Sequence, residues 1–273
     1  MPELPEVETV KRDISRYILG RSIKAVRVID GRVIRGISIK AFANRLIGRK
    51  FVEISRRGKA IICRLDDEQL FVVQLMMTGQ LVYAASIPQN PPKETKVIFE
   101  LSDASALNYN DQRLFGRLSL IKKLEDIKYF TILGPEPFDK SFNPQFMKDH
   151  LTRRSVPIKN ALMDHTFVAG IGNIYASEIL FRSRIDPRRR AHRLKLNEIE
   201  CVHRVTREVL DEAIKFRGSS MRNYRDGDGK KGTFNKRIKV YAREDEPCES
   251  CRAPIVRIVQ GGRSTFFCQS CQK

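Results

Sequence analysis

Four cysteines near the end of the chain constrain its fold more than any other feature. They form two Cys-x-x-Cys pairs, Cys248 with Cys251 and Cys268 with Cys271, separated by sixteen residues. Two such pairs at this spacing predict a tetrahedral site of four thiolates that holds one structural zinc ion. A redox dithiol, the alternative, explains one pair but not two. Because four thiolates leave no open coordination position, we expect the metal to be structural rather than catalytic.

The segment between the two cysteine pairs predicts a β-hairpin. Its residues alternate between apolar and polar types, and Gly261-Gly262 provide a tight turn. Arg263 follows this turn and would project from a rigid tip, where a guanidinium suits a phosphate. The module has too few apolar residues to fold alone, so the metal supplies much of its stability. Cys63 and Cys201 lie in apolar stretches and are expected to be ordinary core thiols.

The rest of the chain divides into two regions by the period of its apolar residues. From residue 23 to about residue 123, short alternating runs predict an antiparallel β-sandwich. In residues 143 to 216 the apolar residues recur at helical spacing. Residues 133–137 (LGPEP) show neither the strand nor the helix spacing, which predicts a hinge between the two regions. We therefore expect an α+β protein of three domains: a β-sandwich with flanking helices at 1–134, a helical domain at 135–240 and a zinc-ribbon hairpin at 241–273.

The chain is strongly basic, with 51 Lys and Arg against 32 Asp and Glu and a formal net charge of +19. This excess implies a polyanionic partner, and nucleic acid is favoured because neutralising phosphates releases counterions. A membrane is disfavoured, since the basic residues are spread along the chain and no apolar run is long enough to span a bilayer. The acidic, amphipathic N terminus is unlike a signal peptide, which predicts an intracellular protein. No self-complementary apolar surface is evident, which favours a monomer.

The N-terminal sequence Met1-Pro2-Glu3-Leu4-Pro5-Glu6 suits both a helix start and a catalytic amine. Removal of Met1 would leave Pro2 as a free secondary amine, and α-amino groups have a reference pKa of roughly 7.7 to 8. Attack of such an amine on a sugar carbon gives a cationic iminium that acts as an electron sink. Proline and glutamate are equally ordinary at a helix start, and the apolar spacing up to Ile18 predicts a helix that begins at Pro2. The terminus alone leaves both interpretations open.

Further motifs occur in order along the chain: PELPEVE at the N terminus, RRGK at 56–59, MTG at 77–79, YNDQRLFG at 109–116, LGPEP at 133–137, AGIGNIYASEILF at 169–181, VYARE at 240–244 and GGRSTFFCQSCQK at 261–273. Together they resemble the formamidopyrimidine-DNA glycosylase family, which also includes the endonuclease VIII type. The resemblance covers the whole chain. It implies a bifunctional base-excision enzyme that flips a damaged nucleotide out of duplex DNA, cleaves the glycosidic bond and cuts the backbone by β,δ-elimination.

The resemblance also implies roles for single residues at the reacting sugar. Pro2 is implied as the nucleophile at C1′, and Glu3 as the proton donor to the sugar ring oxygen or the departing fragment. Glu6 is implied to support the proline, which fits carboxylates within one helical turn of it. Lys59 is implied to contact the phosphates beside the flipped nucleotide, although a solvated lysine at a strand start is the ordinary interpretation.

The implied DNA contacts extend beyond the reacting sugar. Asn173 is implied in a helix-two-turn-helix motif, where backbone N–H groups at a helix start can bind a phosphate, and Arg263 is implied as the phosphate ligand of the zinc hairpin. Gln74 stands where the family usually has a histidine near the phosphates. Three residues are implied to fill the space left by the flipped nucleotide, namely Met77, Arg113 and Phe115. For Met77 and Phe115, core packing is the ordinary alternative.

A polar segment from residue 217 to 236 resembles the lesion-capping loop of the oxidised-purine branch, with Ser219, Ser220, Met221, Arg222 and Tyr224. Loops of this length are usually functional or disordered. We therefore predict 8-oxoguanine and formamidopyrimidines as substrates, in duplex DNA that also contains abasic sites, within the bacterial cytoplasm or nucleoid. Two alternatives stay open. One is an endonuclease VIII type glycosylase for oxidised pyrimidines, and the other is a non-catalytic damaged-DNA-binding protein.

Overall fold

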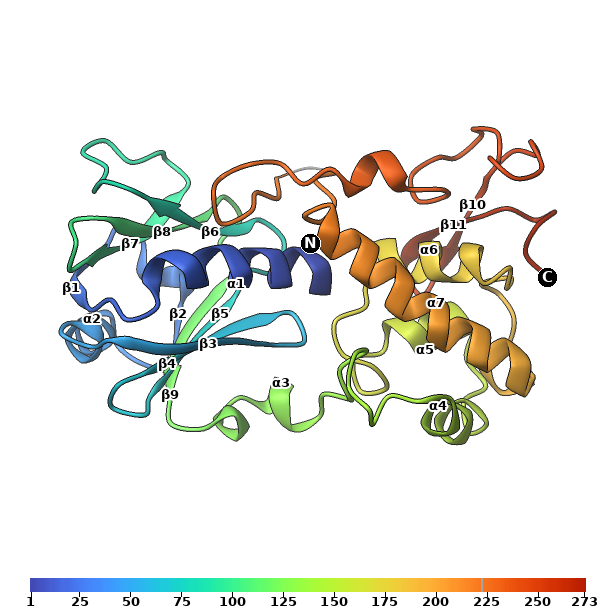
Figure 1. Cartoon of the computed structure of the whole chain (residues 1–273), viewed down its shortest axis with the longest axis horizontal. Helices are drawn as coiled ribbons and strands as arrows, with labels where there is room; N and C mark the ends of the chain where they lie inside the picture. The colour runs from blue at the N-terminus through green and yellow to red at the C-terminus, as the bar shows by residue number, and fades with distance from the viewer. Residues whose placement is uncertain (222) are drawn as a thin grey trace. The chain divides into compact units, whose positions relative to one another are not determined.

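The computed structural model describes residues 1–221 and 223–273, which divide into two compact units. Unit 1 comprises Met1–Thr131 and Ile214–Asn235, and unit 2 comprises Ile132–Ala213 and Lys236–Lys273. Figure 1 shows the elements coloured in chain order. The fold is α+β, as the change of apolar period predicts.

The secondary structure of the described residues consists of seven α-helices, four short 3-10 helices and eleven strands. The α-helices are α1 (Leu4–Ile18), α2 (Ile39–Leu46), α3 (Lys128–Thr131), α4 (Pro144–Leu151), α5 (Ile158–Met163), α6 (Asn173–Arg182) and α7 (Leu196–Lys215). The 3-10 helices are η1 (Gly31–Val33), η2 (Leu124–Asp126), η3 (Ala191–Arg193) and η4 (Phe234–Arg237). The strands are β1 (Ile23–Val28), β2 (Ile34–Arg35), β3 (Phe51–Arg57), β4 (Ala60–Leu65), β5 (Leu70–Gln74), β6 (Gly79–Ala84), β7 (Thr95–Leu101), β8 (Ala106–Asp111), β9 (Arg117–Ile121), β10 (Val256–Gln260) and β11 (Arg263–Phe267).

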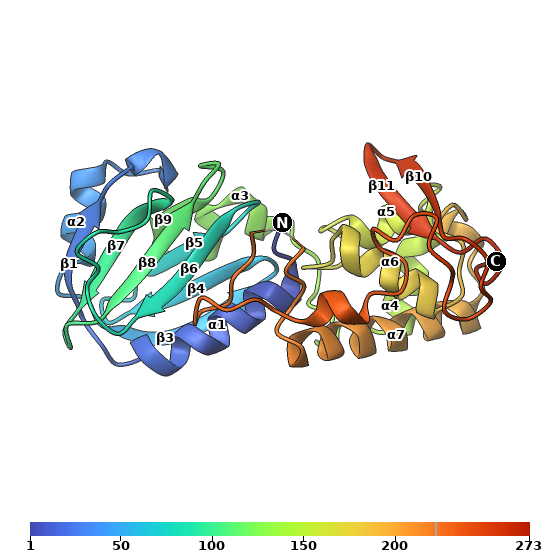
Figure 2. The same ribbon diagram turned by 90° about the horizontal axis from the view of Figure 1, so that it is seen from above.

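Unit 1 is a β-sandwich, as the alternating runs predict. One sheet has the order β1-β7-β8-β6 and the other β2-β9-β5-β4-β3, and only the short β2–β9 pair is parallel among the described strands. The core between the sheets includes Phe42, Phe71 and Phe99, whose rings meet edge-on or tilted at 5.1 to 6.4 Å. Helix α1 contacts β3 and β4 of one sheet and β6 of the other, and α2 contacts β1. Figure 2 shows α1 along one side of the sandwich.

Helix α1 begins at Leu4, two residues later than the sequence predicts. Glu3 is the N-cap, with extended backbone at φ −104° and ψ −171°, and Glu6 completes a capping box with it. Pro5, rather than Pro2, occupies the first helical turn, where its missing N–H costs no hydrogen bond. Pro2 therefore lies just before the helix rather than in it.

Unit 2 contains α4, α5, α6, most of α7 and the ribbon β10–β11. Asn143 caps α4 by accepting a hydrogen bond from the N–H of Phe146, and Pro157 directly precedes α5. Gly261 and Gly262 both have positive φ, 55° and 72°, as a tight hairpin turn requires. In the part of the chain that the structure describes, no helix is both long and apolar enough to cross a membrane.

Candidate active site and nucleic-acid interface

The start of α1 places Pro2 beside two buried carboxylates. Pro2 is buried, and Glu3 and Glu6 are 3% and 2% exposed. Met1 precedes Pro2 and is 50% exposed, so the proline nitrogen belongs to a peptide bond until Met1 is removed. Removal of an exposed residue uncovers the proline amine next to Glu3, which is the arrangement that amine catalysis on a sugar needs.

Each carboxylate oxygen of Glu6 accepts a backbone hydrogen bond. Oε2 accepts from the N–H of Glu3 at 2.8 Å, and Oε1 accepts from the N–H of Ser219 at 2.7 Å. The first bond is local, whereas the second joins α1 to a segment more than two hundred residues away in the chain. Glu6 therefore fixes the segment that begins at Ser219 against the start of α1.

Tyr224, another residue predicted for the capping loop, contacts the same helix as Ser219. The Tyr224 hydroxyl donates to the backbone oxygen of Glu6 at 3.3 Å, and Ser220 Oγ donates to the backbone oxygen of Tyr224 at 3.1 Å. Burial, reinforced by the nearby Glu6 and Asp226 charges, raises the pKa of Tyr224 well above its usual value, so this hydroxyl stays protonated. Met221 is 43% exposed. Arg222 lies outside the described residues.

Ser219 carries a polar group that is buried without a protein partner. Its side chain is 4% exposed, and its Oγ has no hydrogen-bond partner among the described residues. Such groups are rare because an unsatisfied buried hydroxyl costs free energy.

Lys59 and Gln74 lie close together in unit 1. Lys59 is half-buried in the turn between β3 and β4, and its N–H donates to the Tyr129 hydroxyl at 3.3 Å. Gln74 pairs with Ala60, the residue after Lys59, in the β4–β5 register and is 9% exposed. Lys59 therefore directly precedes β4, and Gln74 ends the neighbouring strand β5.

Arg56, in the RRGK motif, joins β3 to α1 through Glu8. Its Nε lies 3.0 Å from Glu8 Oε2, and Arg12 and Lys11 hold the other oxygen at 2.7 and 3.1 Å. Burial alone would raise the pKa of Glu8, but these three cations outweigh it and the pKa is lowered. Arg56 thus braces α1 against β3.

The three predicted void-filling residues occupy two adjacent turns. Met77 lies between β5 and β6 and is 41% exposed, and Phe115 lies between β8 and β9 and is 47% exposed. The Arg113 guanidinium lies 4.6 Å from the centre of the Phe115 ring. Neither Met77 nor Phe115 is a core residue, so the core-packing alternative is wrong for both.

A buried carboxylate, which the sequence analysis left without a role, holds these two turns together. Asp111 is fully buried and accepts from the N–H groups of Gly116 at 2.8 Å and Arg113 at 3.2 Å. It also accepts from the Thr78 hydroxyl, and Thr78 Oγ1 in turn accepts from the N–H of Arg113 at 3.0 Å. Because Thr78 follows Met77, this network fixes both turns relative to each other.

In unit 2, a buried lysine connects Asn173 to the ribbon. Lys159 Nζ donates to Asn173 Oδ1 at 2.6 Å, to Thr265 Oγ1 at 2.7 Å and to the backbone oxygen of Ser264 at 3.1 Å. Asn173 Nδ2 donates to the same Ser264 oxygen at 2.9 Å. Arg263, exposed at the start of β11, therefore sits on a strand that is fixed to the start of α6. A lone lysine in the sequence PIKNALM gives no sign of this role.

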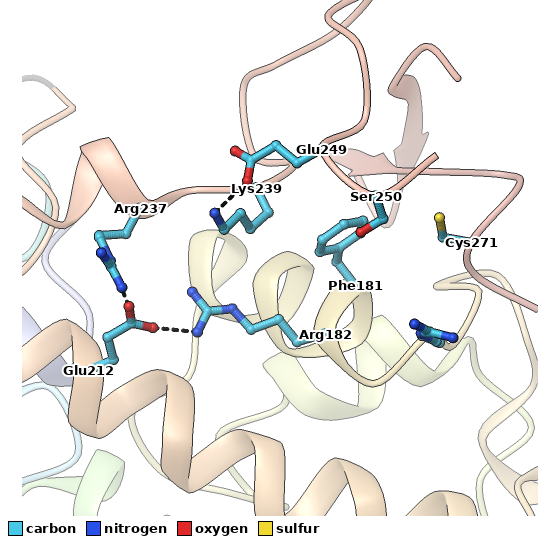
Figure 3. A pocket seen from close by; sticks show the side chains of 9 residues that line it. Phe181, Arg182, Glu212, Arg237, Lys239, Glu249, Ser250 and Cys271 are labelled. Atoms are coloured by element: carbon cyan, nitrogen blue, oxygen red, sulfur yellow. Dashed lines mark hydrogen bonds and ion pairs between the residues drawn. The ribbon is translucent and has the colours of Figure 1, made fainter. Parts of the chain in front are cut away.

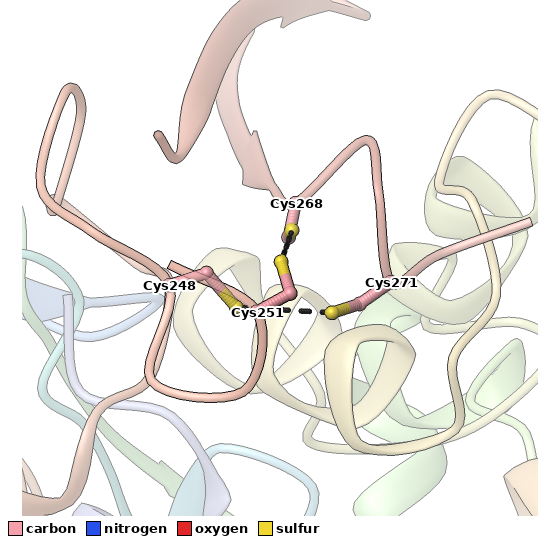
Figure 4. Close-up of side chains that lie close together, drawn as sticks. All are labelled: Cys248, Cys251, Cys268 and Cys271. Carbon is pink, nitrogen blue, oxygen red and sulfur yellow. Dashed lines mark hydrogen bonds between the residues drawn. The ribbon is translucent and has the colours of Figure 1, made fainter. Parts of the chain in front are cut away.

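The four predicted cysteines meet at one point, which Figure 4 shows. Their Sγ atoms all lie within 4.8 Å of one another, with Cys251 and Cys268 at 3.4 Å and Cys248 and Cys271 at 3.9 Å. Zn–S bonds of about 2.3 Å in a tetrahedron separate the sulfurs by about 3.8 Å. The thiols thus fit one zinc ion, which the protein holds as a structural metal.

Two further carboxylates of α6 and α7 brace the segment that leads to the zinc site. Glu178 is fully buried and accepts from the N–H groups of Lys239, Val240 and Tyr241 at 2.9 to 3.0 Å. Glu212 accepts from both Arg182 and Arg237, beside a polar pocket of about 480 Å³ that Cys271 also lines. Figure 3 shows Glu212 between the two guanidinium groups. No sequence pattern indicated either brace.

Family models match most of the chain. Residues 1–118 match the formamidopyrimidine-DNA glycosylase N-terminal domain, and residues 133–225 match the formamidopyrimidine-DNA glycosylase H2TH domain. Residues 245–273 match a zinc finger found in FPG and IleRS. The three matches lie in the same order as the sandwich, the helices and the ribbon.

Individual proteins resemble the chain over its whole length. It is 43% identical over 274 residues to a formamidopyrimidine-DNA glycosylase of Desulfitobacterium hafniense and 40% identical over 277 residues to one of Desulforamulus reducens, with at least 99% of each chain covered. A solved Lactococcus lactis Fpg in complex with DNA containing an abasic site has a TM-score of 0.92 at 32% identity, covering 99% of both chains. The Fpg structure from Thermus thermophilus has a TM-score of 0.88 at 36% identity, covering 99% of this chain and 98% of that one.

Proposed function

The chain belongs to the formamidopyrimidine-DNA glycosylase family, and from that premise we propose that it excises oxidised purines from duplex DNA and then cleaves the strand. The substrates are 8-oxoguanine and formamidopyrimidines. A solved relative from Lactococcus lactis is described in complex with DNA that contains Fapy-dG. The observation that carries the proposal is the buried start of α1, where Pro2 adjoins Glu3 and Glu6. Such a substrate places the protein with the chromosome, in the bacterial cytoplasm and nucleoid.

In the proposed reaction, the Pro2 nitrogen forms a bond to C1′ of the damaged nucleotide. The glycosidic bond breaks, the base leaves with the electron pair, and the N–H proton that the Pro2 nitrogen gives up on forming the bond passes to the departing base. Glu3 donates a proton to the sugar ring oxygen as the ring opens, and the nitrogen lone pair completes a C1′ iminium. This electron sink allows loss of a C2′ proton with departure of the 3′ phosphate, followed by loss of a C4′ proton with departure of the 5′ phosphate. Glu6 supports the proline from within one helical turn.

The remaining predicted residues are proposed as DNA contacts. Lys59, Gln74, Asn173 and Arg263 bind phosphates, and Met77, Arg113 and Phe115 fill the space left by the extruded nucleotide. Both Met77 and Phe115 are exposed and therefore accessible to DNA, as this role requires. We propose a catalytic domain at residues 1–134, a helix-two-turn-helix DNA-binding domain at residues 135–240 that contributes Asn173, with the capping loop at 217–236, and a zinc finger at residues 241–273 that contributes Arg263.

Borohydride trapping on labelled duplexes tests the proposed reaction. Protein whose mass shows that Met1 has been removed is expected to form a covalent adduct with duplexes that contain 8-oxoguanine, formamidopyrimidine or an abasic site. The matched control is the same chain with a blocked N terminus, which keeps every side chain but has no free α-amine. Pro2→Ala is a second control. Equal trapping by the blocked chain would exclude Pro2 as the nucleophile.

The choice of lesions makes the test informative about substrate class. An adduct that forms fastest with an oxidised pyrimidine would place the chain with the endonuclease VIII type. Tight binding to damaged DNA without any adduct from processed protein would instead indicate a damage-binding protein. The proposal expects the oxidised purines to react faster than the oxidised pyrimidine.

A further inference from the structure

One arginine at the start of the capping loop is shared by two buried aspartates. Arg217 Nη2 lies 2.6 Å from Asp13 Oδ2 on α1, and its Nε lies 2.7 Å from Asp226 Oδ2 in the middle of the loop. The Asp13 and Asp226 side chains are 3% and 0% exposed. We call Asp13, Arg217 and Asp226 the Arg217 clasp. It joins three separate segments of unit 1: helix α1 at Asp13, the start of the loop at Arg217 and the middle of the loop at Asp226.

The backbone of the loop is strained at the clasp. Arg217 has φ +60°, in the left-handed region that non-glycine residues seldom adopt, and Gly218 follows with φ +75°. A strained residue persists where its surroundings hold it in place, and such residues occur preferentially at functional sites. The two guanidinium bonds of Arg217 supply that restraint, since they pull its side chain toward both aspartates.

The turn that follows delivers Ser219 to Glu6. A Cβ on Gly218 would lie 2.8 Å from both Cγ and Oε1 of Glu6, so the backbone approaches that carboxylate as closely as glycine permits. The N–H of Ser219 then donates to Glu6 Oε1 at 2.7 Å. Glu6 and Asp13 are seven residues apart on α1, which puts both on the same face of the helix. The clasp and the Glu6 contact are therefore two attachments of one loop to one helix face.

The clasp also fixes the far part of the loop. Asp13 Oδ2 accepts from the N–H of Gly227 at 3.0 Å, and Asp226 Oδ1 accepts from the N–H groups of Asp228 at 3.0 Å and Lys230 at 2.8 Å. The backbone oxygen of Gly227 accepts from the N–H of Tyr83 on β6 at 2.9 Å. The middle of the loop is thus attached to both α1 and the edge of a sheet.

We propose that Asp13, Arg217 and Asp226 are positioning residues for base excision, which hold the capping loop so that Ser219 remains against Glu6 while a damaged base is bound. This inference rests on the proposed function. None of the three residues needs to touch the substrate, because each acts through the loop. A substrate that still carries its base needs the loop, whereas a preformed abasic site has no base to hold. The clasp should therefore matter more for base excision than for cleavage at an abasic site.

Substitutions on either side of the clasp test this proposal. Asp13→Asn and Arg217→Gln are expected to lower the single-turnover rate of formamidopyrimidine excision at least tenfold, with less than threefold change in borohydride trapping on an abasic site. Arg217→Lys keeps the charge but not the forked geometry and is expected to fall between wild type and Arg217→Gln. The matched control is Arg16→Gln, because the Arg16 side chain is 56% exposed and reaches the loop at Asp228 over 3.4 Å, where an exposed pair contributes little.

Hydrogen exchange provides a readout that does not depend on activity. The amides of Ser219 and Gly227 are expected to lose protection in Asp13→Asn and Arg217→Gln, while the amides of α1 keep theirs. Excision within twofold of the Arg16→Gln control would overturn the clasp proposal, and so would an equal loss of excision and trapping. If wild-type protein neither excises nor traps, the proposed function itself fails and the clasp proposal fails with it.

Discussion

In unit 1 a single arginine, Arg217, is shared by two buried aspartates, Asp13 and Asp226, whereas in unit 2 a single carboxylate, Glu212, is shared by Arg182 and Arg237. The two arrangements differ mainly in the burial of their carboxylates. The aspartates of the clasp are at most 3% exposed and Glu212 is 21% exposed, while Arg217, Arg182 and Arg237 are 37%, 24% and 50% exposed. Removing one partner of a buried pair typically costs about 3 to 5 kcal/mol, but an exposed pair contributes only about 0 to 1 kcal/mol.

The difference in burial follows from the size of the apolar core in each region. The sandwich of unit 1 has a continuous apolar core, and the clasp is laid against the α1 helix that closes it. The zinc ribbon has a small apolar cluster that includes Val240, Ile255 and Phe266 together with the cysteines. Its position depends instead on the metal, on Lys159 and on Glu178. We therefore expect the effect of a substitution in unit 2 to depend on whether it removes metal coordination, a buried hydrogen bond or a partly exposed ion pair.

The largest expected effect comes from removing the zinc. Cys268→Ser, or treatment with a chelator, should abolish zinc binding and weaken duplex binding at least a hundredfold, because the ribbon that carries Arg263 loses its main support. Zinc analysis and DNA titration measure both effects. The strands of unit 1 should remain folded, as reported by circular dichroism.

Cysteines outside the cluster provide the control for zinc removal. Cys201→Ser should leave zinc content and duplex affinity unchanged, since this thiol lies on α7. Burial raises the pKa of the Cys63 thiol to about 12, so Cys63 forms no thiolate to replace a lost ligand. Duplex affinity that survives complete loss of zinc would show that the ribbon does not depend on the metal.

A smaller effect is expected from Lys159→Met. The substitution removes the donor to Asn173, Thr265 and Ser264 and leaves buried acceptors unsatisfied, which should lower the free energy of unfolding by about 2 to 4 kcal/mol. Duplex affinity should fall about tenfold, since Asn173 and Arg263 lose their common support, while zinc content stays at one per chain. Denaturant unfolding and DNA titration measure these changes, with Lys148→Met as an exposed control. Wild-type stability in Lys159→Met would contradict the proposed role of the buried ammonium.

Local patterns in the sequence were sufficient to predict the sandwich, the helices and the zinc ribbon. Alternation, helical period and the spacing of four cysteines are all properties of short segments. The long-range hydrogen bonds and ion pairs that hold the site were not predictable in this way. Asp111, Lys159 and Arg217 act through partners far away in the chain, and each looks like an ordinary polar residue among its neighbours. The start of α1 was misplaced for a related reason, since Pro2 and Pro5 are equally good helix-start residues and only the extended backbone of Glu3 distinguishes them.

The smallest expected effect concerns Glu212. Burial alone would raise the pKa of Glu212, but hydrogen bonds from Arg182 and Arg237 outweigh it and lower the pKa below the ordinary value of 4.5. The folded state therefore binds fewer protons than the unfolded state in this range. The stabilisation is complete above the unfolded pKa and is lost as the pH falls through the folded pKa.

Glu212→Gln should accordingly lower the free energy of unfolding by at most about 1 kcal/mol near neutral pH, because the pair is partly exposed and screened by solvent. The difference between wild type and variant should shrink as the pH falls below about 4.5. Urea unfolding of both proteins across that range measures it. A loss as large as that of Asp13→Asn would mean that burial does not distinguish the two arrangements, and Glu212 would then hold the segment before the zinc site as firmly as the Arg217 clasp holds its loop.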